Sequence, residues 1–97
     1  MKSWATIIWV SKNRQWVVTR QPDGEGSVFE NEGSDFEVNS RLLADWTVHG
    51  GNEDVFSEEQ SRPFRIYIQG RFSYWQEALR IGRRWSGDLI TQCEAAT

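Results

Sequence analysis

Residues 3–32 read SWATIIWVSKNRQWVVTRQPDGEGSVFENE, and this stretch decides the fold. Residues 3–11 and 15–21 are rich in β-branched and aromatic side chains, which is typical of strands. Between them and the next apolar run, PDGEG at 22–26 predicts a tight turn, because Pro22 fixes its own φ while Gly24 and Gly26 accept positive φ. Residues 27–32 predict a third strand. Three successive strands indicate an antiparallel meander.

The middle of the chain carries signals for a helix. Ser34 and Glu37 have capping-box spacing, and apolar residues recur at helical intervals up to the Gly50-Gly51 pair. The alternative is that residues 35–39 form a strand and that the helix begins near Ser40. Residues 50–62 have the composition of a polar loop. PFRIYIQG at 63–70 alternates apolar and polar residues and predicts a half-buried strand.

A second helix is predicted over residues 73–85. Tyr74, Ala78, Ile81 and Trp85 recur on one helical face, which indicates that they belong to the core. Ser73 and Gln76 repeat the capping-box spacing. Gly82 weakens the helix by about 1 kcal/mol relative to alanine, and Gly87 is expected to end it. Residues 88–93 predict a short last strand or a tail.

These elements predict an α+β fold: one small domain, residues 1–97, with a mostly antiparallel sheet and two helices packed on one face. A chain of 97 residues provides one modest core. Cys93 is the only cysteine, so no intramolecular disulfide can form and a reducing compartment is the default. The apolar run at the start is too short to span a membrane. We therefore expect a cytoplasmic monomer without membrane contact, in the host cytoplasm if a phage encodes it.

Charge is strongly polarised along the chain, although the net charge is only −3. Residues 22–61 contain eleven acids and one base, Arg41, while the remainder contains ten bases and three acids. Concentrated like charge repels itself and lowers stability, so its presence suggests selection for a negative surface. The candidate partner-binding residues are Asp23, Glu25, Glu30, Glu32, Asp35, Glu37, Glu53, Asp54, Glu58 and Glu59.

The residue combinations that catalysis needs are not found in the sequence. His49 is the only histidine, and Ser86 lacks the glycine frame of a nucleophile elbow. There is no cysteine or histidine pair for zinc, and no glycine pattern for a dinucleotide or a phosphate loop. A metal-dependent nuclease would need a lysine close to its acids, whereas Lys2 and Lys12 both precede the acidic segment. We expect no enzymatic activity, cofactor or metal.

The acids recur at a spacing that favours mimicry of nucleic acid. Glu30 and Glu32 would lie on the same side of a strand, about 6.6 Å apart, so rows of such carboxylates can imitate rows of phosphates. The expected partner is a basic nucleic-acid-handling protein or a ribonucleoprotein complex. The simpler interpretation is that each acid is only a solvent-facing charge, with Glu37 and Arg41 paired at i, i+4.

In size and acidic character the whole chain resembles the small anti-CRISPR proteins of phages and mobile elements, without a shared motif. Many of those proteins are acidic, single-domain and non-enzymatic. The resemblance implies an inhibitor that presents a DNA-like surface to the basic channel of a CRISPR surveillance complex. It assigns no role to any particular residue.

The helix at 73–85 supports an alternative function. Arg80, Arg83 and Arg84 lie beside Tyr74, Trp75 and Trp85, and arginine with aromatic residues is typical of nucleic-acid binding. Because the helical spacing places Tyr74 and Trp85 in the core, direct nucleic-acid binding is not the function we expect. A coherent acidic face would favour mimicry, a continuous basic stripe would favour nucleic-acid binding, and intermixed charges would favour neither.

Overall fold

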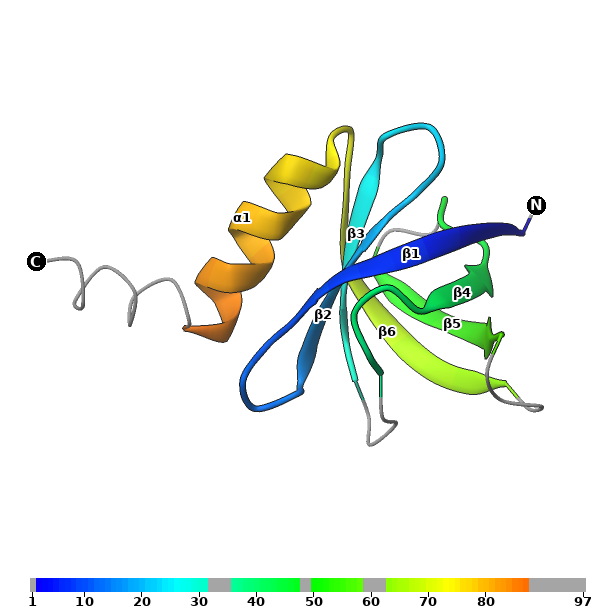
Figure 1. The fold of residues 1–97 in the computed structure, drawn as a ribbon, viewed down its shortest axis with the longest axis horizontal. Coiled ribbons are helices and arrows are strands. Elements are labelled where there is room, and N and C mark those ends of the chain that lie inside the picture. The colour runs from blue at the N-terminus through cyan, green and yellow to red at the C-terminus, as the bar shows by residue number, and fades with distance from the viewer. Residues whose placement is uncertain (1, 32–35, 48–49, 59–62, 88–97) are drawn as a thin grey trace, which may run out of the picture.

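The computed structural model describes residues 2–31, 36–47, 50–58 and 63–87, and within them six antiparallel strands close into a barrel with one helix packed on its outside (Figure 1). Around the barrel the strands follow the order β1-β2-β3-β6-β5-β4, and β4 pairs with β1 to close it. The elements are β1 Ser3–Val10, β2 Trp16–Arg20, β3 Gly26–Glu30, β4 Arg41–Ala44, β5 Gly51–Ser57, β6 Phe64–Phe72 and α1 Trp75–Ser86.

The expected sheet with two helices on one face is wrong. The segment predicted to be the first helix contains β4, and neither the helix nor the alternative strand at 35–39 is present in its described part. Leu42 and Ala44 point into the barrel while Arg41 and Leu43 point outward, which is a period of two. Adjacent apolar residues at 42 and 43 fit both a helical and a strand period, and this ambiguity produced the error.

The polar loop predicted at 50–62 is also wrong, because β5 occupies much of it. Val55 is its fully buried residue, whereas Asn52 and Asp54 face solvent, so the strand has little apolar signal. Pairing with β6 from Gly51 to Val55 holds the strand in place. Tertiary pairing therefore overrides a composition that is unfavourable for a strand.

The predicted strands at 3–11, 15–21, 27–32 and 63–70 are confirmed as β1, β2, β3 and β6, with ends shifted by one or two residues. In the turn after β2, Gly24 has a φ of 92°, as predicted, but Gly26 already belongs to β3 and does not have positive φ. The segment at 88–93 and residue Ser34 lie outside the described residues.

Two apolar clusters hold the fold together. The larger one fills the barrel and includes Ile7, Phe29, Leu42, Ile66 and Ile68. Phe36 and Trp46 also contribute to it from outside the strands, and both contact Phe29 at ring-centroid distances of 5.5 and 6.5 Å. The second cluster lies between the barrel wall and α1 and consists of Val18, Val28 and Ala78 with partly buried neighbours. β2 and β3 are consequently covered on both faces.

Glycine sets the distance between α1 and the barrel. A Cβ at Gly82 would lie 2.5 Å from Cγ2 of Val18, and a Cβ at Gly26 would lie 2.7 Å from Cα of Trp75. Gly82 is therefore required by packing at this contact. The helix ends at Gly87 with φ 88°, as predicted. The predicted Ser73 cap is wrong, since the N-cap is Tyr74 in an extended conformation without a side-chain hydrogen bond.

α1, the helix in the described part of the chain, is neither long nor apolar enough to cross a membrane.

Candidate functional surfaces

The two acids of the β2–β3 turn are held by local contacts. The Asp23 carboxylate accepts a hydrogen bond from the backbone N–H of Glu25 at 3.0 Å. Glu25 itself forms an ion pair with Arg71 of β6 at 2.8 Å. Asp23 thus stabilises the turn and Glu25 its contact with β6, in addition to any role with a partner.

Glu30 and Glu37 lie apart from these acids. Glu30, at the end of β3, accepts a hydrogen bond of 2.6 Å from the side chain of Gln69. Glu37 is exposed in the segment before β4, which is not helical, so its predicted helical pairing with Arg41 is wrong. Glu32, Asp35 and Glu59 lie outside the described residues, and the predicted row of Glu30 with Glu32 stays a prediction.

The acids of β5 and of the residue that follows it are near arginines on neighbouring strands. Asp54 pairs with Arg65 of β6 at 3.3 Å, and Glu58 receives two hydrogen bonds from Arg41 at 3.0 and 2.8 Å. The hydrogen bonds to Glu58 and its negative charge raise the pKa of Arg41 above its ordinary value. Glu53 is half-buried in β5, on the face opposite Asp54.

Positive and negative charges are therefore intermixed over much of the described surface. The described residues include ten Lys and Arg and nine Asp and Glu, so they do not carry the acidic excess of the whole chain. Exposed ion pairs contribute only about 0–1 kcal/mol each, and their carboxylates can exchange one arginine for another. The seven candidate acids that lie within the described residues do not form one continuous face.

An apolar row crosses the outside of the barrel opposite α1. Trp4 of β1 is the cross-strand neighbour of Leu43 in β4, and Leu43 is the neighbour of Phe56 in β5. Trp4 is 36 % exposed, and Leu43 and Phe56 are half-buried. We call these three residues the Trp4 row. The outer face of a barrel strand is usually polar, so three adjacent apolar side chains there make the Trp4 row a candidate contact surface.

Cations flank the Trp4 row. The Lys2 ammonium lies 4.6 Å from the ring centroid of Phe56, and the Arg41 guanidinium lies 5.0 Å from that of Trp4. Such contacts contribute about 0.5–1 kcal/mol at exposed sites. They also order two long side chains beside the row, which lowers the entropy lost when a partner covers it.

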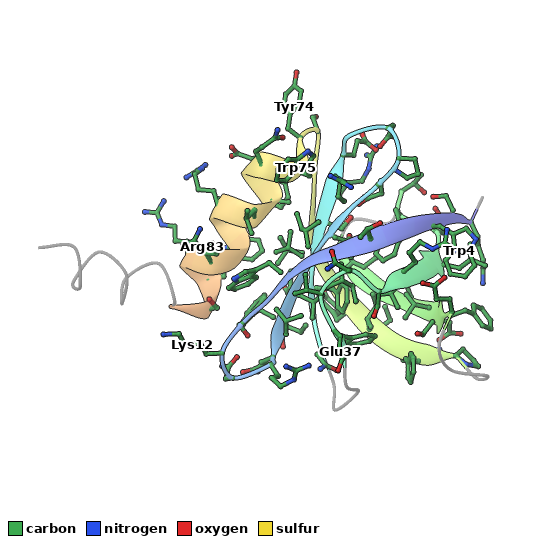
Figure 2. The ribbon with its side chains drawn as sticks, viewed as in Figure 1. Trp4, Lys12, Glu37, Tyr74, Trp75 and Arg83 are labelled. Atoms are coloured by element: carbon green, nitrogen blue, oxygen red, sulfur yellow. The ribbon has the colours of Figure 1, made fainter. Side chains whose placement is uncertain are left out.

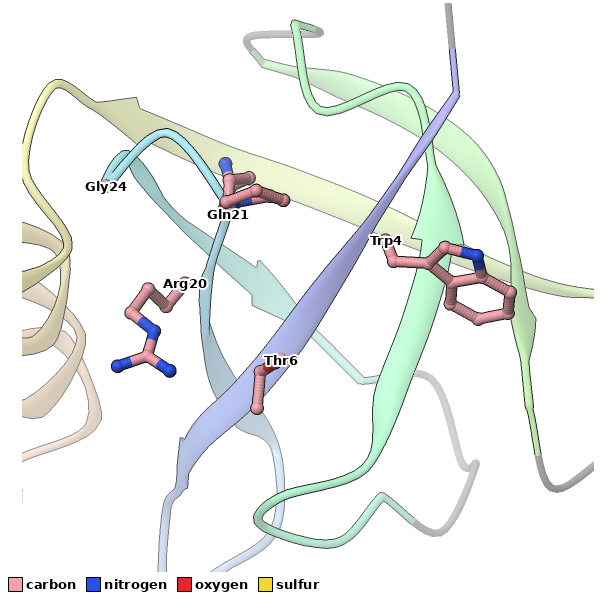
Figure 3. A pocket seen from close by; sticks show the side chains of 6 residues that line it. Trp4, Thr6, Arg20, Gln21 and Gly24 are labelled. Atoms are coloured by element: carbon pink, nitrogen blue, oxygen red, sulfur yellow. The ribbon is translucent and has the colours of Figure 1, made fainter.

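A shallow hollow of about 260 Å³ adjoins the row (Figure 3). Its lining comes from β1, the end of β2 and the β2–β3 turn, and includes Trp4, Thr6, Arg20 and Gln21. Figure 3 shows that the indole of Trp4 and the guanidinium of Arg20 point to opposite sides. The polar groups do not converge, so the hollow has the character of a contact surface and lacks the geometry of a catalytic pocket. Within the described residues, no group of three or more His, Cys, Asp or Glu side chains is placed to hold a metal ion.

Sequence reasoning missed the Trp4 row. The sequence of β1 is apolar at both alternating sets of positions, so it did not show that Ala5 and Ile7 point inward and Trp4 outward. Phe56 could not be placed, because β5 was not recognised as a strand.

Comparison of the chain with protein-family models, with curated proteins and with solved structures gives no match. The resemblance to anti-CRISPR proteins stays a prediction.

Proposed function

We propose that this chain is a non-enzymatic binding protein that recognises a protein partner through the Trp4 row. The observation that carries the proposal is the continuity of Trp4, Leu43 and Phe56 across three paired strands on the side of the barrel away from α1. Trp and Arg are the residue types that most often dominate binding energy at protein interfaces. Here an exposed Trp, a stacked Arg41 and two apolar neighbours form one compact group.

Two acids border the row beside the cations Lys2 and Arg41, and these acids favour a partner that carries arginines. Asp54 and Glu58 are about half and one third exposed, so both carboxylates are accessible. A partner arginine can replace the internal one at little cost, because exposed ion pairs are weak. A basic nucleic-acid-handling protein, as expected from the sequence, fits this border. Full DNA mimicry would require a coherent acidic face, which the described residues do not supply.

The proposal is tested by affinity capture from the source cell with the wild type and with matched variants. Trp4→Ala combined with Phe56→Ala should lose the captured partner. Tyr74→Ala, which removes an exposed aromatic ring on α1, should retain it. With the partner in hand, Trp4→Ala should weaken binding about 30-fold or more, the loss typical of a central aromatic anchor.

Charge reversal distinguishes the role of the acids beside the Trp4 row from that of the aromatic residues within it. Asp54→Lys with Glu58→Lys should slow association, with a smaller effect on dissociation, because rim charges act mainly on the on-rate. Binding that survives the Trp4 and Phe56 substitutions would sink the proposal. If the acid reversals instead accelerate binding, the partner is acidic and the predicted partner class is wrong.

A further inference from the structure

The aromatic side chains at both ends of α1 are exposed. Tyr74 is 70 % and Trp85 is 45 % exposed, so their predicted place in the core is wrong. The centre of the buried face lies at Ala78 and Gly82, where small residues bring the helix close to the barrel. The larger rings at the two ends extend past this contact. Figure 2 shows Tyr74 projecting away from the barrel.

Trp85 is exposed yet held in position. Its ring packs against Trp16 at a centroid distance of 5.8 Å and against Phe72 at 6.4 Å. Gly70 leaves room for the Phe72 ring on which Trp85 packs, because a Cβ there would lie 3.0 Å from Cε2 of Phe72. The indole is therefore a fixed platform with part of its surface open to a ligand.

Cations outnumber acids along the same helix. Glu77 is the acid of α1 and pairs with Arg80 at 2.7 Å. In the described part of the chain, Arg83 and Arg84 have no carboxylate partner. Arg20 of β2 lies 6.0 Å from the ring centroid of Trp75 and extends the positive charge to the start of the helix.

We propose that this surface binds single-stranded nucleic acid, with bases stacked on Tyr74 and Trp85 and phosphates bound by arginine. We call it the α1 surface; it consists of Arg20, Tyr74, Arg80, Arg83, Arg84 and Trp85. Tyr74 and Trp85 are separated by eleven residues, which is about 16 Å along a helix and spans several nucleotides. Along the helix axis Arg80, Arg83 and Arg84 lie between these two residues. Guanidinium groups suit phosphate oxygens, and aromatic rings accept any unstacked base. A duplex, whose bases are already stacked, cannot use the rings.

The position of α1 in the fold favours a polyanion there. The helix contacts β2, β3 and β6, whereas Asp54 and Glu58 belong to the β5 region (Figure 1). Exposed charges are screened beyond about 8 Å at physiological ionic strength. Repulsion from Asp54 and Glu58 is therefore weak at the helix. The nearer acids are those of the β2–β3 turn, where the Gly24 carbonyl accepts a hydrogen bond from the Trp75 N–H at 2.9 Å, and Glu25 of that turn is paired with Arg71.

Fluorescence anisotropy with labelled oligonucleotides of about 12 residues tests the proposal. Thymidine and uridine oligomers should bind saturably, and a duplex of equal length should bind much more weakly. If Arg20, Arg83 and Arg84 each neutralise one phosphate, log K should fall with log salt at a slope of about −2. Tyr74→Ala should weaken binding about 5-fold or more, in the range for loss of one stacked base, and we expect it to fold because the side chain is 70 % exposed.

Matched substitutions separate the α1 surface from the rest of the protein. Arg83→Glu with Arg84→Glu should abolish binding, whereas Arg65→Glu on the far side should leave it unchanged. Circular dichroism of each variant confirms folding. Absence of saturable binding at about 50 mM salt, binding unaffected by the Arg83 and Arg84 reversals, or equal affinity for the duplex would each overturn the proposal. Loss of a captured protein on these reversals, with no oligonucleotide binding, would assign α1 to a protein partner instead.

Discussion

At Gly82, sequence and structure give opposite expectations about whether glycine lowers or raises the stability of the protein. Glycine in a helix costs about 1 kcal/mol relative to alanine, and from sequence this position is a weak point. In the structure it faces Val18, and a Cβ would lie 2.5 Å from that side chain. The burial of Val18 and Val28 beneath the helix offsets the cost in propensity. This contact joins residues 64 positions apart, so local sequence patterns could not reveal it.

Gly82→Ala should destabilise the protein by about 1–3 kcal/mol in urea unfolding, because overpacking outweighs the gain in helix propensity. Adding Val18→Ala creates room for the new methyl group. The double variant should therefore lose less stability than the sum of the two single variants. A more stable Gly82→Ala protein would contradict the packing argument.

Asp45 gives a prediction about pH. Its carboxylate accepts hydrogen bonds from the hydroxyl and the backbone N–H of Thr47 at 2.5 and 3.1 Å, and these bonds lower the pKa of Asp45. Thr47→Val removes the hydroxyl bond and should raise that pKa, as measured by NMR titration. Because the folded pKa lies below the unfolded one, the bond stabilises the protein above about pH 4 and loses its effect as the pH falls through the folded pKa. A stability difference between wild type and variant that grows in acid would refute the assignment.

At the scale of elements, the turn before β4 excludes the predicted helix. Asn39 has a φ of 77°, a left-handed conformation that does not occur inside an α-helix. Its backbone N–H bonds the carbonyl of Ile7 at 2.7 Å, and the N–H of Ile7 bonds the carbonyl of Ser40 at 2.8 Å. These bonds attach the start of β4 to β1.

Asn39→Val should lower stability by about 1–2 kcal/mol, because a β-branched residue is strained at positive φ. Asn39→Gly should be neutral or slightly stabilising, and it serves as the control. Chemical unfolding measures both variants, and amide shifts in β4 report whether the turn still forms. Equal tolerance of valine and glycine would mean that the turn does not have this conformation.

The elements predicted from sequence are those with a strong local signal. β1, β2, β3, β6 and α1 have apolar patterns that identify them without their partners. β4 and β5 form because a closed barrel supplies hydrogen-bond partners on both sides of each strand. Their own residues show no clear strand pattern. The candidate surfaces were also hard to predict, because they depend on contacts between residues that are distant in the sequence. The acids were visible in the sequence, but their arginine partners lie up to 46 residues away, as for Glu25 and Arg71.

At the scale of the whole molecule, neighbouring strands of the barrel differ in how many residues they pair. β4 and β5 pair through two register positions, whereas β2 and β3 pair through five and are covered on both faces. Amide hydrogen exchange measured by NMR should therefore be faster in β4 and β5 than in β2 and β3. Uniform protection of all six strands would contradict this expectation and indicate a single cooperative unit.

The strand order also determines when the barrel can close during synthesis on the ribosome. Among the strands that the structure describes, β6 is the last to emerge, yet it lies between β3 and β5. A nascent chain that ends before Phe64 presents two open strand edges and leaves the interior aromatic residues uncovered, which favours aggregation. Stalled or prematurely terminated products should therefore need chaperones or rapid proteolysis. Only chains that include the whole of β6 can close the barrel.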